Sequence, residues 1–346
     1  MNFWKRLAYL AYVVVVCLVL LELAVRFWGY SERYIYDPVY QPFPKSKEIP
    51  YVHKPCLEHA RARGLVDLTT DKLGLRTSRG CVDYGPPAPN EIRIAIAGDS
   101  VTFGEGIPDA KDTYPEIVES LLQKRLPWAK VRVFNFGVSA YSVREMVAVL
   151  EKRMLAIDPD IVIMAIIPHD FDIGRAGTLD KWGYTVHARP ESFLARYPRL
   201  RNFLRHFHVL YLFRDIYAGY FGKGHRAPPK KVSKGEVPAA WQYVKRFAEI
   251  ATSHHKRYII LLLPALDRTF SGKFIRWLKE NKIVFLDTSH LVNEFSMDKF
   301  MASPFDAHPS AAVHRAIAKE LADFILKNMK LKARQEPGQS HSQIGK

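Results

Sequence analysis

Cysteine and acidic residues are scarce in this sequence of 346 residues. Its three cysteines are too few to form a disulfide framework. The 35 Asp and Glu stand against 51 Lys and Arg, which gives a formal net charge of +16 at pH 7. No internal repeat and no notable low-complexity tract appears. With 48% hydrophobic and 25% charged residues, the composition excludes a disordered or collagen-like protein, and the length allows one large domain with appendages or two modest domains.

The longest uncharged run lies at the N-terminus, where residues 7–21 read LAYLAYVVVVCLVLL. Apolar character resumes after Glu22 and continues to Trp28. At 1.5 Å per residue, a helix over residues 7–28 is about 33 Å long, which matches the core of a bilayer. No small-x-small cleavage site follows, so we expect an uncleaved anchor over residues 1–28 rather than a signal peptide. Lys5 and Arg6 precede the run, so the positive-inside rule places the body outside the cytoplasm, in a periplasm or at the cell surface.

An exported body would place two of the three cysteines in an oxidising compartment. In an oxidising compartment Cys56 and Cys81 can form one bridge, whereas Cys17 would lie in lipid and stay free.

Residues 29–89 are rich in Pro and Tyr and poorly patterned, and we interpret them as a juxtamembrane approach segment. We expect the main domain at 90–328, with an insertion at about 174–238, and a flexible tail at 329–346.

From residue 91 onward, short apolar runs alternate with helical periodicity. Strands are predicted at 92–97, 131–136, 161–167, 258–263 and 283–287, and helices at 114–126, 142–155, 239–254, 273–281 and 309–327. Ser142 and Glu145 form the capping box of one of these helices. Alternation of this kind, with fully apolar strands, predicts a parallel sheet covered by helices on both faces. The site of such a sheet lies outside the carboxyl ends of its strands.

One serine and one histidine are placed to meet at that edge. Ser100 follows the first strand within Gly98-Asp99-Ser100, in a sequence that is neither the G-x-S-x-G elbow nor a phosphate or dinucleotide loop. Asp306 and His308, two residues apart before the last helix, can both point to one side of an extended loop. A serine nucleophile needs such a base and an orienting acid.

Taken together and in order, these segments resemble the SGNH (GDSL-type) hydrolase family, in a membrane-anchored form. The resemblance covers roughly residues 70–327 and is carried by Gly98-Asp99-Ser100, Asn135-Phe136-Gly137, His169-Asp170 and Asp306-x-His308, with Gly74-Leu75-Arg76 upstream. It implies a flavodoxin-like three-layer α/β/α sandwich and a serine esterase or acyltransferase. No cofactor and no metal is expected.

The resemblance also implies roles for individual residues. Ser100 would be the nucleophile, His308 the general base and Asp306 its orienting partner, with Asp287 as a reserve acid. The oxyanion donors would be the backbone N–H groups of Ser100 and Gly137 and the His169 side chain. Two departures stand out: His169 occupies a position where the family has Asn, and many members place the acid three residues before the histidine rather than two.

The insertion is basic and aromatic. Apolar residues fall at helical spacing with basic flanks: Leu200, Phe203, Leu204, Phe207, Leu210 and Tyr211. The pattern favours a lid helix over the cleft, then a helix on an anionic membrane surface, and only distantly a nucleic-acid patch.

These observations predict a serine hydrolase that acts on an acyl ester, with a glycan or a lipid as the carrier, and no nucleic-acid partner. The alternatives are an O-acyltransferase that modifies a cell-surface polysaccharide and, because of His169, a catalytically impaired anchored binding or assembly protein.

Overall fold

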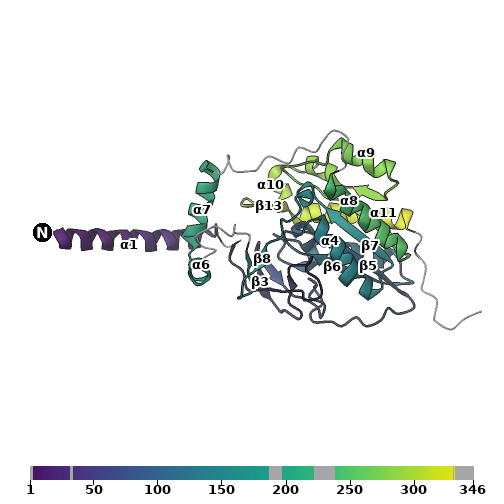
Figure 1. Ribbon diagram of the computed structural model, residues 1–346, viewed down its shortest axis with the longest axis horizontal. Helices are drawn as coiled ribbons and strands as arrows, with labels where there is room; N and C mark the ends of the chain where they lie inside the picture. Colours follow the sequence, from purple (N-terminus) through teal and green to yellow (C-terminus); the bar gives the residue numbers. More distant parts are fainter. Residues whose placement is uncertain (1–2, 32–33, 187–196, 222–237, 330, 332–346) are drawn as a thin grey trace, which may run out of the picture.

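A parallel sheet of five strands forms the centre of the main body, in the order β11-β10-β7-β5-β6 (Figure 1). The structure is a computed structural model that describes residues 3–31, 34–186, 197–221, 238–329 and 331. The strands are β5 (Glu91–Gly98), β6 (Lys130–Gly137), β7 (Ile161–Ile166), β10 (Arg257–Leu262) and β11 (Phe285–Asp287). Every residue of β5 and β7 is buried, as expected for strands covered on both faces.

Helices cover both faces of this sheet. On one face α4 (Val143–Val149), α8 (Ala239–Ser253) and α9 (Gly272–Glu280) enclose one hydrophobic core. On the other, α3 (Tyr114–Arg125) and α11 (Ala311–Asn328) enclose a second. The strand order, with the second strand at one edge and the first beside it, is flavodoxin-like. The predicted three-layer α/β/α sandwich is confirmed.

The predicted elements match the observed ones to within a few residues. The main difference follows α4, where the helix expected to run to residue 155 changes into a π-helical turn, Leu150–Met154, and a 3₁₀ turn, Leu155–Ile157. The capping box that begins α4 is present, with Ser142 N–H donating to the Glu145 carboxylate at 2.9 Å.

The segment before the sheet is more structured than its composition indicates. It forms the short pairs β1 (Tyr40–Gln41) with β2 (Val52–His53) and β3 (Ala60–Ala62) with β4 (Val66–Leu68). Its side chains join the core on the α4 side, where Tyr51 and Leu68 are fully buried. A disulfide joins Cys56 to Cys81. The segment therefore packs on the main body as part of its core.

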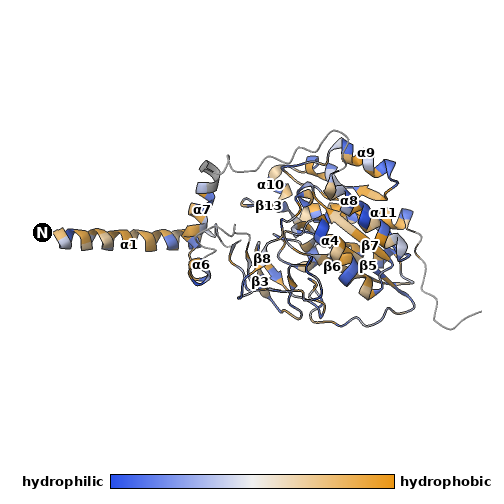
Figure 2. Ribbon diagram, viewed as in Figure 1, coloured by the Kyte–Doolittle hydropathy of each residue, from blue (hydrophilic) through white to orange (hydrophobic). Residues whose placement is uncertain are grey.

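The N-terminal helix α1 (Phe3–Trp28) projects from the body, and Figure 2 shows that it is apolar over most of its length. It is long and apolar enough to cross a membrane. The described part of the insertion contains the hairpin β8 (Thr178–Leu179) and β9 (Thr185–Val186), then α6 (Pro198–Leu204) and α7 (His208–Phe221). In Figure 1, α7 lies across the body-side end of α1. Almost all of the predicted tail lies outside the described residues.

Candidate active site

Ser100 begins the short helix α2 (Ser100–Phe103), directly after the carboxyl end of β5. Asp99 caps this helix by accepting a hydrogen bond from Val101 N–H at 2.9 Å. Gly98 and Gly137 are paired at the ends of β5 and β6. A Cβ on Gly98 would lie 1.9 Å from the Thr102 hydroxyl, so glycine is required for α2 to sit on the strand ends. This packing holds Ser100 at the edge of the sheet.

His308 reaches Ser100 from the other end of the chain. It lies in β13 (Asp306–Pro309), which pairs with β12 (Met301–Ser303) just before α11. Its Nε2 is 2.9 Å from Ser100 Oγ, and its Nδ1 is 2.6 Å from Asp306 Oδ1. The Asp306 carboxylate also accepts a bond from the His308 N–H at 3.1 Å, which fixes the two residues relative to each other. Asp287, the reserve acid, instead accepts bonds from Ser289.

Ser100 and His308 line a cavity of about 180 Å³. Its walls come from three parts of the chain: the sheet edge, the segment before the sheet and the insertion. The other lining residues are Tyr36, Tyr40, Tyr51, Arg63, Glu105, Ser139, Ala140, Arg175 and Thr185. Pockets for drug-sized ligands usually measure about 300 to 1,000 Å³. The cavity therefore suits a small group such as a short acyl ester.

The electrostatics of the cavity favour a charged imidazole. Burial lowers the pKa of His308, but the charges of Glu105, Asp306 and Asp99 and the hydrogen bond that the imidazole donates to Asp306 outweigh it and raise that pKa to about 9. Glu105 is buried and is held by Arg63 at 3.2 Å and by the Ser139 hydroxyl at 2.9 Å.

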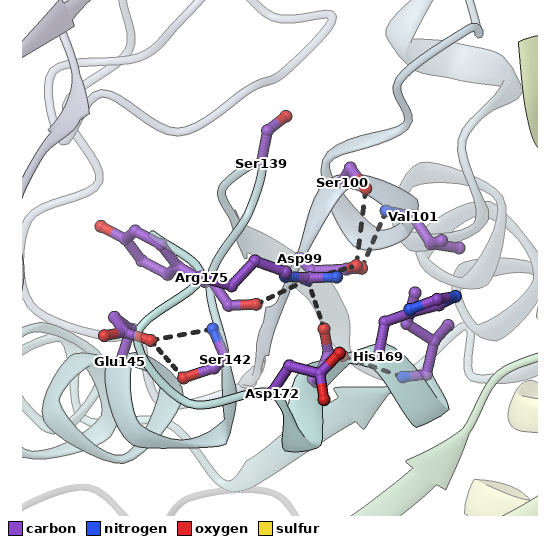
Figure 3. Close-up of polar contacts among 12 residues, drawn as sticks. Asp99, Ser100, Val101, Ser139, Ser142, Glu145, His169, Asp172 and Arg175 are labelled. Carbon is purple, nitrogen blue, oxygen red and sulfur yellow. Dashed lines mark hydrogen bonds and ion pairs between the residues drawn. The ribbon is translucent and has the colours of Figure 1, made fainter. Parts of the chain in front are cut away.

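Half-buried Arg175 and two buried carboxylates form a charged cluster beside Ser100. Arg175 Nη2 is 3.1 Å from Asp99 Oδ2 and 2.6 Å from Asp170 Oδ1, and both of these carboxylates are fully buried. Figure 3 shows the Arg175 guanidinium beside the Asp99 carboxylate, toward which the Ser100 side chain also points. Burial, with the charge of Asp99, raises the pKa of Asp170 well above its usual range. The cluster ties the insertion to the turn that carries Ser100.

Two of the predicted oxyanion donors are not directed into the cavity. Gly137 does not line it, and its N–H donates to the Asn135 side chain at 2.9 Å. The reason is the turn after β6: Gly137 lies beneath α2, where a Cβ would be 2.3 Å from Phe103 N. His169 also lies outside the lining, and its Nε2 is 2.8 Å from Asp267 Oδ1. Both groups are thus engaged elsewhere in this structure, and their assignment as oxyanion donors stays a prediction.

Ala140 occupies the place expected for Gly137. It lines the cavity and has a φ of 68°, in the left-handed region that favours glycine. Within the described residues neither its N–H nor that of Ser100 donates a hydrogen bond inside the protein. This position could not be predicted from the sequence, because an alanine in a turn is not distinctive.

Arg76, part of the upstream Gly74-Leu75-Arg76, supports the loop after Ser100. Its guanidinium is buried and donates to four backbone carbonyls, those of Phe103, Gly104, Ile107 and Pro108, at 2.6 to 3.0 Å. These carbonyls belong to α2 and the loop that follows it. Arg76 therefore fixes the loop that carries Glu105.

Sequence reasoning missed the contribution of the segment before the sheet. Tyr36, Tyr40, Tyr51 and Arg63 line the cavity, although residues 29–89 were expected to be only an approach. The richness of that segment in tyrosine was its one visible signal. The insertion was expected to form a lid helix over the cleft. Its described residues contribute Arg175 and Thr185 to the cavity lining, and no lining residue lies in α6 or α7.

Searches against family models and curated proteins gave no match. Among solved structures, the chain is similar to a member of the lipolytic protein G-D-S-L family from Veillonella parvula, with 16% identity and a TM-score of 0.40 over 69% of this chain and 100% of that one. It is similar to an acetylxylan esterase from Geobacillus stearothermophilus, with 15% identity and a TM-score of 0.39 over 71% and 97% of the two chains. A two-domain esterase active on acetylated mannans shares 16% identity, with a TM-score of 0.41 over 71% of this chain and 51% of that one. The five-stranded parallel sheet of this chain, with its two helical layers, is the fold that the sequence resemblance to SGNH (GDSL-type) hydrolases implied.

Proposed function

We propose that this chain is a serine hydrolase that cleaves a small acyl ester, with Ser100 as nucleophile, His308 as base and Asp306 as its orienting acid. The observation that carries the proposal is the continuous contact from Ser100 Oγ to His308 Nε2 at 2.9 Å and from His308 Nδ1 to Asp306 Oδ1 at 2.6 Å. Ser100 and His308 meet at the wall of a cavity although 208 residues separate them.

The geometry supports acyl transfer through a covalent intermediate. Neutral His308 accepts the Ser100 hydroxyl proton while Oγ attacks the ester carbonyl, and the imidazolium formed is stabilised by Asp306. The imidazolium then protonates the leaving alkoxide, which leaves an acyl-serine. Water, deprotonated by His308, attacks that acyl group and releases the acid and free Ser100.

The developing oxyanion needs hydrogen-bond donors at the cavity wall. We assign this role to the backbone N–H groups of Ser100 and Ala140, because both residues line the cavity and neither N–H donates within the described protein. One such donor is typically worth about 2.7 to 4 kcal/mol in the transition state.

The proposal includes attachment to a membrane through α1, with the body on the non-cytoplasmic side. The helix has 26 residues and most of its side chains are exposed, with only Val25 buried, so little protein surface among the described residues covers its apolar side chains. The disulfide between Cys56 and Cys81 is consistent with an oxidising compartment.

Fluorophosphonate labelling of the purified full-length protein tests the triad. We expect labelling of the native protein, none of Ser100→Ala, and hydrolysis of a short-chain aryl ester that is lost in the same variant. Ser139→Ala is the matched control, since Ser139 lines the same cavity without contacting His308 in the described structure. Labelling or esterase activity that survives in Ser100→Ala would refute the assignment.

Transfer to a sugar hydroxyl instead of water is the alternative outcome of the same chemistry. It is distinguished by adding an oligosaccharide acceptor to the ester assay: the acyl-enzyme then partitions to the sugar, and acylated oligosaccharide forms faster than free acid.

A further inference from the structure

A row of exposed apolar side chains runs along α6 and α7. Leu210, Phe213 and Tyr217 lie on α7 at intervals of three and four residues, which is the spacing of one helical face. Phe203 lies on α6 and Phe207 in the turn between the two helices. The exposed fractions of the five side chains lie between 36% and 67%. We call these five residues the apolar row. Each of these side chains keeps a third or more of its surface exposed.

Other groups of the two helices attach them to α1. The Glu22 carboxylate accepts bonds from the first N–H groups of α7, those of His208 at 3.0 Å and Val209 at 2.8 Å. Arg26 pairs with Glu22 and donates to the His206 carbonyl at 2.9 Å. Val209 and Val25 are buried at this junction. The N-terminus of α7 is thus fixed against the last two turns of α1.

This attachment sets the depth of α7 relative to a membrane. Glu22 is the first charged residue after the uncharged run 7–21, so it marks the end of the segment that can lie in the hydrocarbon core of a bilayer. Its charge is satisfied by Arg26 and by the N-terminus of α7. Because α7 begins at this level and lies across α1 (Figure 1), its axis runs along the membrane plane rather than through it.

We propose, resting on the membrane anchoring of α1 proposed above, that α6 and α7 are a second membrane contact, whose apolar row lies in the boundary between headgroups and acyl chains of a lipid bilayer. Amphipathic helices with aromatic and aliphatic side chains on one face bind bilayers in this manner. Exposed Arg199 adjoins the row on α6 and suits anionic headgroups, whereas Arg214 is paired with Asp215 at 2.7 Å.

The same contacts connect this surface to the cavity. The hydroxyls of Tyr30 and Tyr34 donate to Asp215 of α7 at 2.8 and 2.7 Å. The rings of Trp28 and Tyr30 pack on Phe305, the residue before Asp306.

A second connection runs through the insertion. Arg201 and Arg205 of α6 pair with Asp180, in the turn between β8 and β9, and Thr185 of β9 lines the cavity. Membrane contact by α6 and α7 therefore holds Ser100 beside the bilayer surface, within reach of esters presented by membrane-bound amphiphiles.

Spin labels in the full-length protein, reconstituted in nanodiscs of phosphatidylcholine and phosphatidylglycerol, measure the depth of each surface. The native Cys17 reports on α1, and Phe213→Cys on the apolar row in a Cys17→Ser background. Glu280→Cys, exposed on α9 away from α1, is the aqueous reference. We expect the labels at 17 and 213 to collide preferentially with oxygen, and the label at 280 with a water-soluble nickel chelate.

The outcomes separate the two proposals. A label at 213 that is as accessible to nickel as the one at 280, or shielded from both reagents as in a protein contact, overturns the membrane role of α7. A label at Cys17 that behaves like the aqueous reference overturns the anchoring on which it rests.

An activity assay tests the consequence for substrate. The variant Phe213→Ser with Tyr217→Ser should hydrolyse a short-chain ester of a bilayer-embedded lipid at least fivefold more slowly, with unchanged activity on a soluble aryl ester. Trp128→Ser, which removes an aromatic side chain of similar exposure on the loop between α3 and β6, should change neither rate. Equal rates on the lipid ester in the native and double-variant proteins would contradict the proposal.

Discussion

Replacing Glu105 with Gln should make the enzyme active at lower pH. His308 must be neutral to accept the Ser100 proton, yet its pKa in the folded protein is about 9. The kcat/KM of the native enzyme should therefore be small at neutral pH and rise as the pH approaches 9. Glu105 is one of the three carboxylates that raise this pKa, with Asp306 and Asp99, and the only one outside the triad and the α2 cap.

The size of the effect follows from the neutral fraction of His308. With a pKa of about 9, only ~1% of the imidazole is neutral at pH 7. Each unit by which the loss of the Glu105 charge lowers that pKa multiplies the neutral fraction about tenfold. We expect a gain of roughly tenfold in kcat/KM at pH 7, with little change above pH 9.5.

The assay is a pH profile of kcat/KM on a soluble aryl ester, corrected for spontaneous hydrolysis. Gln keeps the shape of Glu and an oxygen that accepts the Ser139 hydrogen bond, so the cavity should remain intact. Glu91→Gln is the matched control: Glu91 is also buried and paired with an arginine, but at the opposite end of β5, about 23 Å from Gly98. A rising limb that stays in place in Glu105→Gln would show that Glu105 does not act on His308.

Four further substitutions test individual contacts. Asp306→Asn should lower kcat by roughly 10³- to 10⁴-fold, because the imidazole loses its orienting acid. Stopped-flow or steady-state ester hydrolysis measures this loss. A loss smaller than tenfold would show that another acid orients His308. His169→Ala should change kcat less than about threefold, because the His169 ring is bound to Asp267. Loss of a true oxyanion donor would lower kcat by about a hundredfold or more. A loss of that size in the same assay would show that His169 is an oxyanion donor. Arg76→Ala should cost about 3 kcal/mol in urea unfolding, since it removes charged hydrogen bonds to four buried or half-buried carbonyls; an unchanged midpoint would contradict that role. Arg175→Met should also cost about 3 kcal/mol, because Asp99 and Asp170 lose their cation, and the unfolding midpoint measured at pH 7 decides it.

Much of the fold could be predicted because the sheet is buried on both faces. Runs such as residues 92–97 and 161–167 are apolar throughout, and their alternation with helical periodicity determines a parallel arrangement. The π-helical turn at residues 150–154 could not be predicted, because its residues are ordinary helix formers and tertiary packing decides it. The short strands at residues 40–68 were equally hidden, since two- and three-residue strands leave no periodicity.

The site was predictable where chemistry depends on residue type. Ser100, Asp306 and His308 are predicted through the resemblance of their segments to SGNH (GDSL-type) hydrolases. They meet in the structure, and their catalytic role is a proposal. Backbone donors are different, because any residue carries an N–H and only the path of the turn decides which one faces the cavity. This is why Gly137 was chosen when the turn after β6 places Ala140 at the wall. Glu105 carried no motif signal of its own.

Through the disulfide between Cys56 and Cys81, the stability of the proposed catalytic site depends on the compartment in which the protein folds. The covalent ring it closes contains Arg76, whose guanidinium holds the loop after Ser100. Closing a ring of this size is worth about 3.5 kcal/mol in the chain-entropy treatment. A chain retained in a reducing cytosol would lack that constraint. The loop after Ser100, which Arg76 holds, would then be less stable there. The active form would then mature only after translocation, so production for biochemistry calls for an oxidising host compartment.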